Sequence, residues 1–133
     1  MEKVKLQAQY GLYINGQWRN ASDGATYNAE SPADGSHLAV CAQGSREDVE
    51  AASAAAWEAF KTWKKTTPAQ RAALLNKIAD IIDANKEHLA MVESMDNGKP
   101  IRETMNVDIP MAAEHFRYFA GCILLATKRF QIS

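Results

Sequence analysis

The residues with the widest chemical repertoire are two cysteines and three histidines, and each stands alone in the sequence. Cys41 and Cys122 have neither a neighbouring base nor the Gly-rich elbow that activates a nucleophile. His37, His88 and His115 lack H-E-x-x-H or any comparable metal-binding spacing. We therefore expect two unpaired thiols and three histidines with surface or packing roles.

Acidic pairs and glycines are the next candidates for chemistry. Glu47 with Asp48, and Asp80 with Asp83, fall on polar helix faces, whereas general acid–base catalysis requires burial that shifts a pKa. We expect these carboxylates to be solvated. The seven glycines form neither G-x-G-x-x-G nor G-x-x-x-x-G-K, the patterns that cradle phosphate. No nucleotide-binding loop is predicted.

Composition favours one modest domain, since 47% of the 133 residues are hydrophobic and 23% are charged. The formal net charge is -1 with the signs interspersed, which argues against nucleic acid as a partner. The chain shows neither an apolar leader nor a stretch of about eighteen apolar residues, so a membrane is not expected. With its isolated cysteines, the sequence favours the cytoplasm.

The residues before Ser45 predict short strands separated by turns. Asn15-Gly16 tolerates the positive φ angles of a type I′ turn, which indicates a tight hairpin. Asp23-Gly24 and the segment Pro32 to Gly35 indicate two further turns. Strands or extended segments are expected at residues 11–14, 17–19, 25–27 and 37–43, the last with Leu38, Val40 and Ala42 alternating with other residues.

From Ser45 onward the hydrophobic period is that of helices. Ser45 with Asp48, and Thr67 with Gln70, form capping boxes that begin two helices. Helices are expected at residues 46–64, at 68–97 with a break near Asn85, and at 101–123 with a kink near Val107 caused by Pro110. Several apolar stripes, including Val49, Ala52, Ala56, Phe60 and Trp63, exceed what such short strands could cover.

The most unusual string is Asp96-Asn97-Gly98-Lys99-Pro100. From the residues alone, it predicts a helix C-cap with Gly98 in the left-handed conformation and Pro100 preventing continuation. Together with Glu93, the string also resembles the E-x-x-D/N-x-G-K-P signature of aldehyde dehydrogenases. Further similar segments follow one another in family order: Tyr13 to Trp18, Ser31 to Gly35, the Ala-rich helix with Phe60 and Trp63, Arg71 to Asp80, Asp108 to Pro110, and His115 to Gly121.

This resemblance spans Tyr10 to Ile123 and is strongest to the bacterial acetaldehyde dehydrogenase branch. It implies an α/β fold in which residues 1–123 supply the N-terminal β-hairpin strands and a helical layer of the nucleotide-binding domain. That layer would pack against a parallel sheet encoded downstream. Residues 124–133 form a tail without this resemblance.

The family's working residues would all follow this segment: the oxyanion asparagine of P-W-N-F-P, the NAD(P)-binding lysine and Gly-rich turn, the general-base glutamate and the cysteine nucleophile. Cys122 lacks the F-x-N-x-G-Q-x-C setting of that nucleophile. The resemblance therefore implies NAD(P) for full-length members, and no catalytic or cofactor-binding residue in this chain.

One ligand role is implied by the resemblance. Asp96 would bind a monovalent cation through its side chain, and Ala29 or Glu30 would contribute a backbone carbonyl. Carboxylate and carbonyl oxygens suit a hard cation. A further family ligand would lie outside the chain.

We expect a truncated aldehyde dehydrogenase that is inactive alone, arising from a frameshift or premature stop. The alternative is a non-enzymatic helical module that binds a full-length dehydrogenase subunit or another partner through exposed apolar faces. A third possibility is an inert remnant. The preferred aldehyde and the choice between NAD and NADP are set outside this segment.

Overall fold

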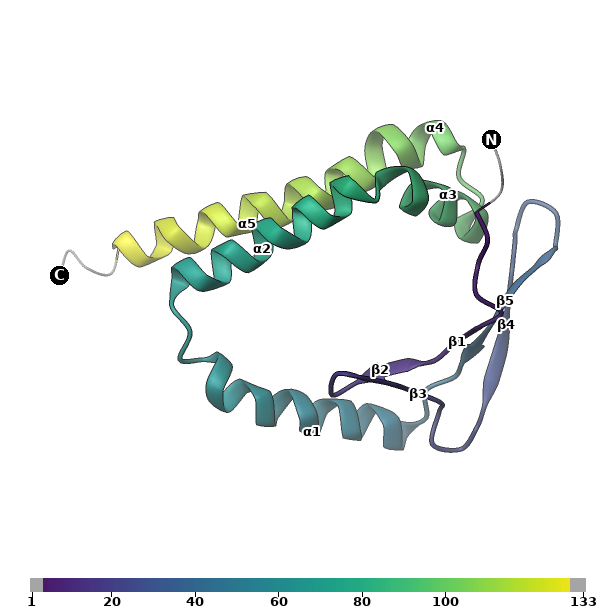
Figure 1. The fold of residues 1–133 in the computed structure, drawn as a ribbon, viewed down its shortest axis with the longest axis horizontal. Helices are drawn as coiled ribbons and strands as arrows, with labels where there is room; N and C mark the ends of the chain where they lie inside the picture. Colours follow the sequence, from purple (N-terminus) through teal and green to yellow (C-terminus); the bar gives the residue numbers. More distant parts are fainter. Residues whose placement is uncertain (1–3, 130–133) are drawn as a thin grey trace. The chain divides into compact units, whose positions relative to one another are not determined.

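The computed structural model describes residues 4–129, which divide into two compact units (Figure 1). The strand unit comprises Lys5–Lys65 with Met95–Asn97, and the helical unit comprises Thr66–Ser94 and the residues from Gly98 onward, with Val4. Composition favoured a single domain, whereas the contacts of the chain separate these two units. Each unit is described by itself.

The strand unit holds a three-stranded sheet, a separate hairpin and one helix. Its elements are β1 (Gln9–Tyr10), β2 (Leu12–Ile14), β3 (Gln17–Arg19), β4 (Thr26–Glu30), β5 (His37–Ala42) and α1 (Arg46–Trp63). β5 lies in the middle of the sheet, parallel to β1 and antiparallel to β4. The sequence patterns did not indicate β1, because this two-residue strand is defined only by its pairing with the distant β5.

The expected hairpin is confirmed. β2 and β3 pair antiparallel with Leu12 opposite Arg19 and Ile14 opposite Gln17. The turn residues Asn15 and Gly16 have φ angles of 53° and 76°, as a type I′ turn requires. The two other expected turns are also present, before β4 and before β5.

The alternation along β5 does not mark a single buried face. Ala39 is the buried residue of this strand, whereas Leu38 and Val40 are half-buried. β5 is flanked on both edges by other strands. Its last three residues, Val40 to Ala42, are all half-buried, whichever face they are on. The period-two pattern thus located the strand without identifying which face is buried.

α1 begins and ends where its sequence predicts. The Ser45 hydroxyl accepts from the Asp48 N–H at 3.2 Å, and the Asp48 carboxylate accepts from the Ser45 N–H at 3.0 Å, which completes the capping box. A hollow beside α1 is lined by residues Tyr13 to Gly16 of the hairpin. Small residues of α1 line its other side: Ala52, Ala55, Ala56 and Ala59. The larger apolar residues of α1 are exposed to solvent, among them Val49 at 65% and Trp57 at 68% exposure.

The helical unit is built from α2 (Pro68–Ala84), the first nine residues of α3 (Lys86–Asn97), α4 (Ile101–Glu103), a π-helical turn η1 (Thr104–Asp108) and α5 (Ile109–Arg129). α2 and α5 lie side by side along most of their length (Figure 1). Most buried residues of this unit are small, which allows the helices to approach closely. They are Ala72, Ala79, Ala90, Thr104, Ile109, Ala113 and Ala120.

Three local expectations for these helices are confirmed. The Thr67–Gln70 capping box and Pro68 begin α2. α2 ends at Ala84 and is capped by Asn85, whose side-chain amide donates to the Ile81 carbonyl at 2.8 Å. Gly98 caps α3 in the left-handed conformation, with φ 77° and an N–H bond to the Ser94 carbonyl.

The kink expected at Pro110 takes the form of the π turn η1. Pro110 has no N–H, and in an α-helix its ring would clash with the carbonyl of Asn106. The wider π turn ends at Asp108, and the Ile109 N–H bonds the Thr104 carbonyl across it. α5 then continues to Arg129, past the expected end at Ile123.

Candidate functional site

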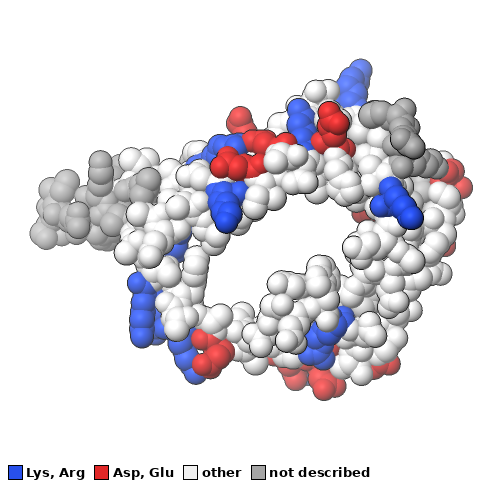
Figure 2. All heavy atoms as spheres, in the orientation of Figure 1, with Lys and Arg blue, Asp and Glu red and all other residues white. Residues whose placement is uncertain are grey.

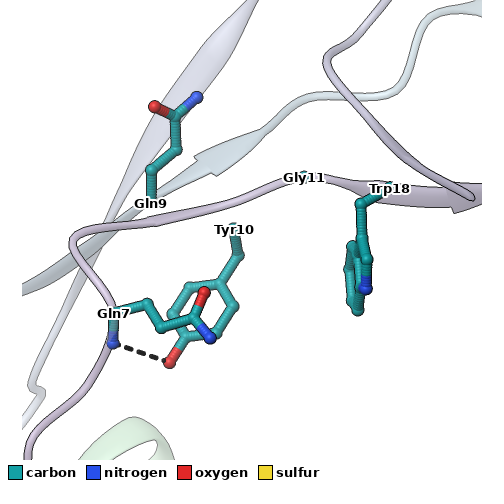
Figure 3. A pocket seen from close by; sticks show the side chains of 5 residues that line it. All are labelled: Gln7, Gln9, Tyr10, Gly11 and Trp18. Atoms are coloured by element: carbon teal, nitrogen blue, oxygen red, sulfur yellow. Dashed lines mark hydrogen bonds between the residues drawn. The ribbon is translucent and has the colours of Figure 1, made fainter.

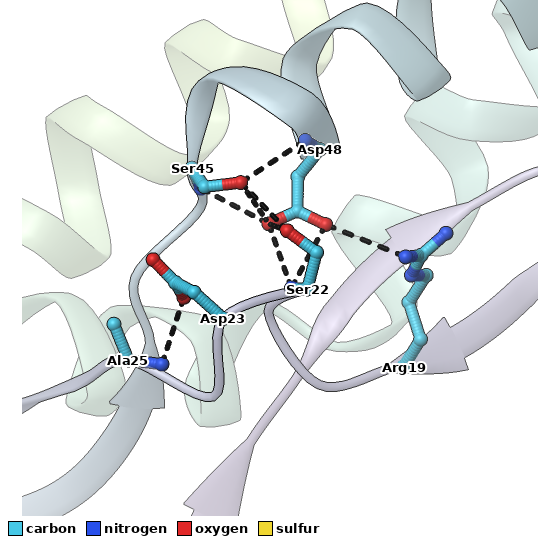
Figure 4. Close-up of polar contacts among 6 residues, drawn as sticks. All are labelled: Arg19, Ser22, Asp23, Ala25, Ser45 and Asp48. Atoms are coloured by element: carbon cyan, nitrogen blue, oxygen red, sulfur yellow. Dashed lines mark hydrogen bonds and ion pairs between the residues drawn. The ribbon is translucent and has the colours of Figure 1, made fainter.

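The carboxylate of Asp48 lies in the densest polar network of the strand unit (Figure 4). Its side chain is only 2% exposed, so the expectation that Asp48 is solvated was wrong. The oxygens accept from the Ser22 N–H at 3.0 and 3.2 Å and from the Ser45 N–H at 3.0 Å. Arg19 approaches to 3.5 Å. The neighbouring Glu47 is exposed, as expected.

These contacts give Asp48 a structural role. The Ser45 and Ser22 backbone N–H groups hold the pKa of Asp48 below its usual range, because they stabilise the ionised form. A carboxylate with a lowered pKa and engaged oxygens is a weak general base. Through these hydrogen bonds, the Asp48 carboxylate connects the turn after β3 to the first turn of α1. The capping box was visible in the sequence, whereas the contact with Ser22 depends on tertiary structure.

The three residues of the expected cation site all belong to the strand unit. Ala29 and Glu30 are on β4, and Asp96 belongs to the short segment that groups with this unit. The pKa of Tyr27, also on β4, is raised mainly by its hydrogen bond with the Cys41 side chain and also by the charge of Asp96.

The backbone at Ala29 and Glu30 is also irregular. The β4–β5 register shifts between these two residues, as at a β-bulge, which disrupts the regular ladder. Both features are compatible with a carbonyl-plus-carboxylate site. Within the described residues, no group of three His, Cys, Asp or Glu side chains is placed to hold a metal. The cation site stays a prediction.

The isolated cysteines and histidines lie where sequence reasoning placed them. Cys41 and Cys122 are both free thiols, each half-buried. His37, His88 and His115 are exposed. The side-chain partner of Cys41 is the Tyr27 hydroxyl, whose raised pKa keeps it protonated and therefore a poor base for the thiol.

A cavity of about 340 Å³ lies beside β1 and was not predicted from the sequence (Figure 3). It is lined by Gln7, Gln9, Tyr10, Gly11 and Trp18, and the Gln7 N–H donates to the Tyr10 hydroxyl at 3.1 Å. The lining has no charged or strongly nucleophilic side chain, so its chemistry is that of packing or binding. Locating it from sequence would have required knowing that Trp18 of β3 lies near Gln7 to Gly11.

Lys99 of the D-N-G-K-P string has a structural contact. Its ammonium donates to Asp108 at 2.8 Å, and this hydrogen bond raises the pKa of Lys99, as do the charges of Asp108, Glu93 and Glu103. The pair connects the segment after α3 to the last residue of the π turn. The string therefore stabilises the junction between α3 and the π turn, consistent with its interpretation as a C-cap.

The charges visible in Figure 2 are of mixed sign. Over α2 and α5, acidic and basic side chains lie beside one another. Such mixing agrees with the interspersed charge of the sequence. Among the described residues, no helix has both the length and the apolar character needed to cross a membrane.

Comparison with known proteins gives one consistent result. The model of the aldehyde dehydrogenase family matches residues 18–131, continuing past Ile123 into the tail that the motifs did not cover. The chain is 48% identical over 121 residues to a long-chain-aldehyde dehydrogenase of Acinetobacter sp, covering 91% of this chain and 24% of that relative. It is 45% identical over 115 residues to acetaldehyde dehydrogenase 2 of Cupriavidus necator, covering 86% of this chain and 23% of that relative.

Solved structures agree in fold. PnpE in complex with nicotinamide adenine dinucleotide matches with a TM-score of 0.83 at 42% identity, over 85% of this chain and 23% of that one. A putative aldehyde dehydrogenase from Burkholderia cenocepacia matches with a TM-score of 0.84 at 41% identity, over 86% and 24%. The chain spans about a quarter of the length of the curated relatives it matches. On the family match and these folds together, the chain belongs to the aldehyde dehydrogenase family.

Proposed function

We propose that these 133 residues are the N-terminal structural segment of an NAD(P)-dependent aldehyde dehydrogenase subunit. In the complete subunit, an aldehyde would be oxidised to a carboxylic acid by thiohemiacetal formation, hydride transfer to NAD(P) and thioester hydrolysis. The family match carries this proposal, because it covers residues 18–131, which are most of this chain. The chain in turn covers only about a quarter of relatives such as the Acinetobacter enzyme. The segment would contribute strands and helices that support a site formed elsewhere.

The segment by itself is proposed to be catalytically inactive. The supporting observation is chemical: neither cysteine stands beside a base in the sequence, and the glycines form no phosphate-binding pattern. Purified chain mixed with an aldehyde and NAD or NADP should form no reduced cofactor and should not bind either nucleotide in a titration. Turnover above a boiled control would overturn this part of the proposal.

The proposed substrate of the complete subunit is an aldehyde of unspecified chain length. Relatives named for long-chain aldehydes and for acetaldehyde match this chain at 48% and 45% identity, so similarity does not favour either. The experiment that tests this proposal is a chimera in which this chain replaces the 121 matched residues of the Acinetobacter enzyme. Aldehyde-dependent NADH formation by this chimera would support the proposed role, and an inactive but folded chimera would contradict it.

A monovalent cation site formed by Asp96 with the carbonyl of Ala29 or Glu30 is also proposed. It is supported by the charge effect of Asp96 on Tyr27 and by the register shift at Ala29 and Glu30. In the chimera, Asp96→Ala should reduce the potassium or sodium dependence of thermal stability, while the exposed Glu87→Ala should leave it unchanged. Unaltered cation dependence in Asp96→Ala would remove the site.

A second candidate role is docking to an aldehyde dehydrogenase subunit as a separate chain, in the cytoplasm. Large apolar residues that remain open on the helices favour it, among them Trp57, Ile81 and Phe119 at 68%, 53% and 57% exposure. Co-purification of the tagged chain with a full-length family member would support it. Recovery of the tagged chain alone from a mixture with that enzyme would count against it.

A further inference from the structure

The sequence contains two asparagines that are followed directly by glycine, at Asn15-Gly16 and at Asn97-Gly98. Such a pair is prone to cyclise, because glycine has no side chain to hinder the approach of its own backbone nitrogen. All four residues are exposed, so water reaches both pairs. Sequence and exposure therefore do not distinguish the two pairs, and a difference in reactivity must come from the backbone.

The reaction open to such a pair is an intramolecular substitution that requires no second protein. The glycine nitrogen loses its proton and attacks the side-chain carbonyl carbon Cγ of the asparagine. A new N–Cγ bond closes a succinimide ring, the Cγ–Nδ2 bond breaks, and the amide leaves as ammonia with that proton. Water then opens the ring. Hydrolysis at Cγ gives aspartate, whereas hydrolysis at the main-chain carbonyl carbon gives isoaspartate. No oxidant or reductant is involved.

The backbone nitrogen of Gly98 is engaged in a helix cap. Its N–H donates to the Ser94 carbonyl at 3.1 Å, and its φ angle of 77° is that of a left-handed cap. Attack by this nitrogen would require the cap bond to break. The next residue is restrained as well, because the Lys99 ammonium donates to Asp108 at 2.8 Å. The helix cap thus protects Asn97.

The backbone nitrogen of Gly16 has a different environment. Asn15 and Gly16 are the central residues of the turn between β2 and β3, and Ile14 pairs with Gln17 across it. The hydrogen bond that closes such a turn is donated by the residue after the glycine, so the glycine N–H has no part in it. A β carbon built on Gly16 would meet no atom within 4 Å, so this side of the turn is open.

We propose that Asn15 is a self-modification site, at which the chain forms a succinimide and then aspartate or isoaspartate, while Asn97 stays intact. The contrast between the two glycine nitrogens carries this inference. It concerns the chemistry of this chain alone and does not depend on the proposed function.

Isoaspartate at this position acts on the hairpin. It carries the main chain through the former side chain and so adds one backbone carbon to a two-residue turn. Ile14 and Gln17 then no longer face each other in register. The rings of Tyr13 and Trp18, whose centroids are 5.0 Å apart across the hairpin, separate with them. The modification therefore loosens the β2–β3 hairpin from its tip.

The test follows both asparagines in one sample of the 133-residue chain. The chain is incubated at mildly alkaline pH, which favours loss of the glycine N–H proton, and is digested with trypsin at intervals. Cleavage after lysine and arginine places the two asparagines in separate peptides, residues 6–19 and 87–102. Mass spectrometry measures conversion of the amide to the acid, and enzymatic methylation of isoaspartate identifies the isomer. Peptide 6–19 should convert at least about fivefold faster, because a hydrogen bond must break only at Gly98.

Asn15→Asp and Asn97→Asp are the matched variants. Aspartate followed by glycine also favours a type I′ turn, so Asn15→Asp keeps the hairpin and removes the reactive amide. Ammonia release during the incubation should fall to a small fraction in Asn15→Asp and stay unchanged in Asn97→Asp. Near-ultraviolet circular dichroism should change with time in the unsubstituted chain and more slowly in Asn15→Asp. Equal conversion of the two peptides, faster conversion of peptide 87–102, or undiminished ammonia release from Asn15→Asp would overturn the inference.

Discussion

Asp48 shows how one side chain can organise a junction between a turn and a helix. Its carboxylate is buried and accepts N–H groups from both Ser22 and Ser45. The sequence identified the local half of this arrangement, since capping boxes have a fixed spacing. It could not identify the other half, because the approach of Ser22 depends on a turn 26 residues earlier.

The lowered pKa of Asp48 predicts acid sensitivity. Its folded-state pKa lies below the unfolded value of about 3.8, so the stabilisation is complete above that value and is lost as the pH falls through the folded pKa. The unfolding midpoint of the chain should drop as the pH decreases below about 4. Asp48→Asn should be less stable at neutral pH and less sensitive to acid, whereas Glu47→Gln should titrate like the unsubstituted chain. Identical acid profiles for the two variants would contradict the assignment.

Loss of the cap can be measured separately. Ser45→Ala removes the hydroxyl that accepts the Asp48 N–H, and should destabilise the strand unit by about 1 kcal/mol. Ser53→Ala, at an exposed position within α1, should be neutral or slightly stabilising because alanine has the higher helix propensity. Chemical denaturation followed by tryptophan fluorescence measures both. Equal effects of the two substitutions would show that the cap contributes little.

At the scale of elements, signals confined to neighbouring residues were the most informative. The hairpin, both capping boxes, the break at Asn85 and the Gly98 cap depend on residues within a few positions of each other, and each is present. The short strand β1 was not predicted, because it is defined by pairing across about thirty residues. The cavity beside it was not predicted, because it depends on the approach of Trp18 to the segment from Gln7 to Gly11. Pro110 indicated an interruption but not its π-helical geometry.

Thr104 should be central to that π turn. Its side chain is fully buried, and its hydroxyl bonds the Ala90 carbonyl at 2.9 Å and the Ser94 hydroxyl at 3.0 Å. Thr104→Val preserves the shape and removes these bonds, which should cost about 1–3 kcal/mol. Thr104→Ser preserves the hydroxyl and should cost less. Urea unfolding followed by circular dichroism compares them, and a valine variant as stable as the unsubstituted chain would argue against this anchoring role.

At the scale of the whole molecule, the family could be predicted from motifs spread along the chain. The motifs from Tyr10 to Ile123 were sufficient to predict the family, and the match to residues 18–131 confirms it. The open apolar residues of the helices, including Trp57, Ile81 and Phe119, agree with the expectation that these helices need further cover. Which of these apolar residues are exposed could not be derived from the sequence, because exposure depends on how the helices pack.

The central claim is that this segment supports, and does not perform, aldehyde oxidation. The most direct measurement compares NADH formation by the isolated chain with that of the chimera in which it replaces the matched residues of the Acinetobacter enzyme. We predict no detectable aldehyde-dependent NADH from the isolated chain and clear turnover by the chimera. Turnover by the isolated chain, or a folded chimera without activity, would contradict the claim.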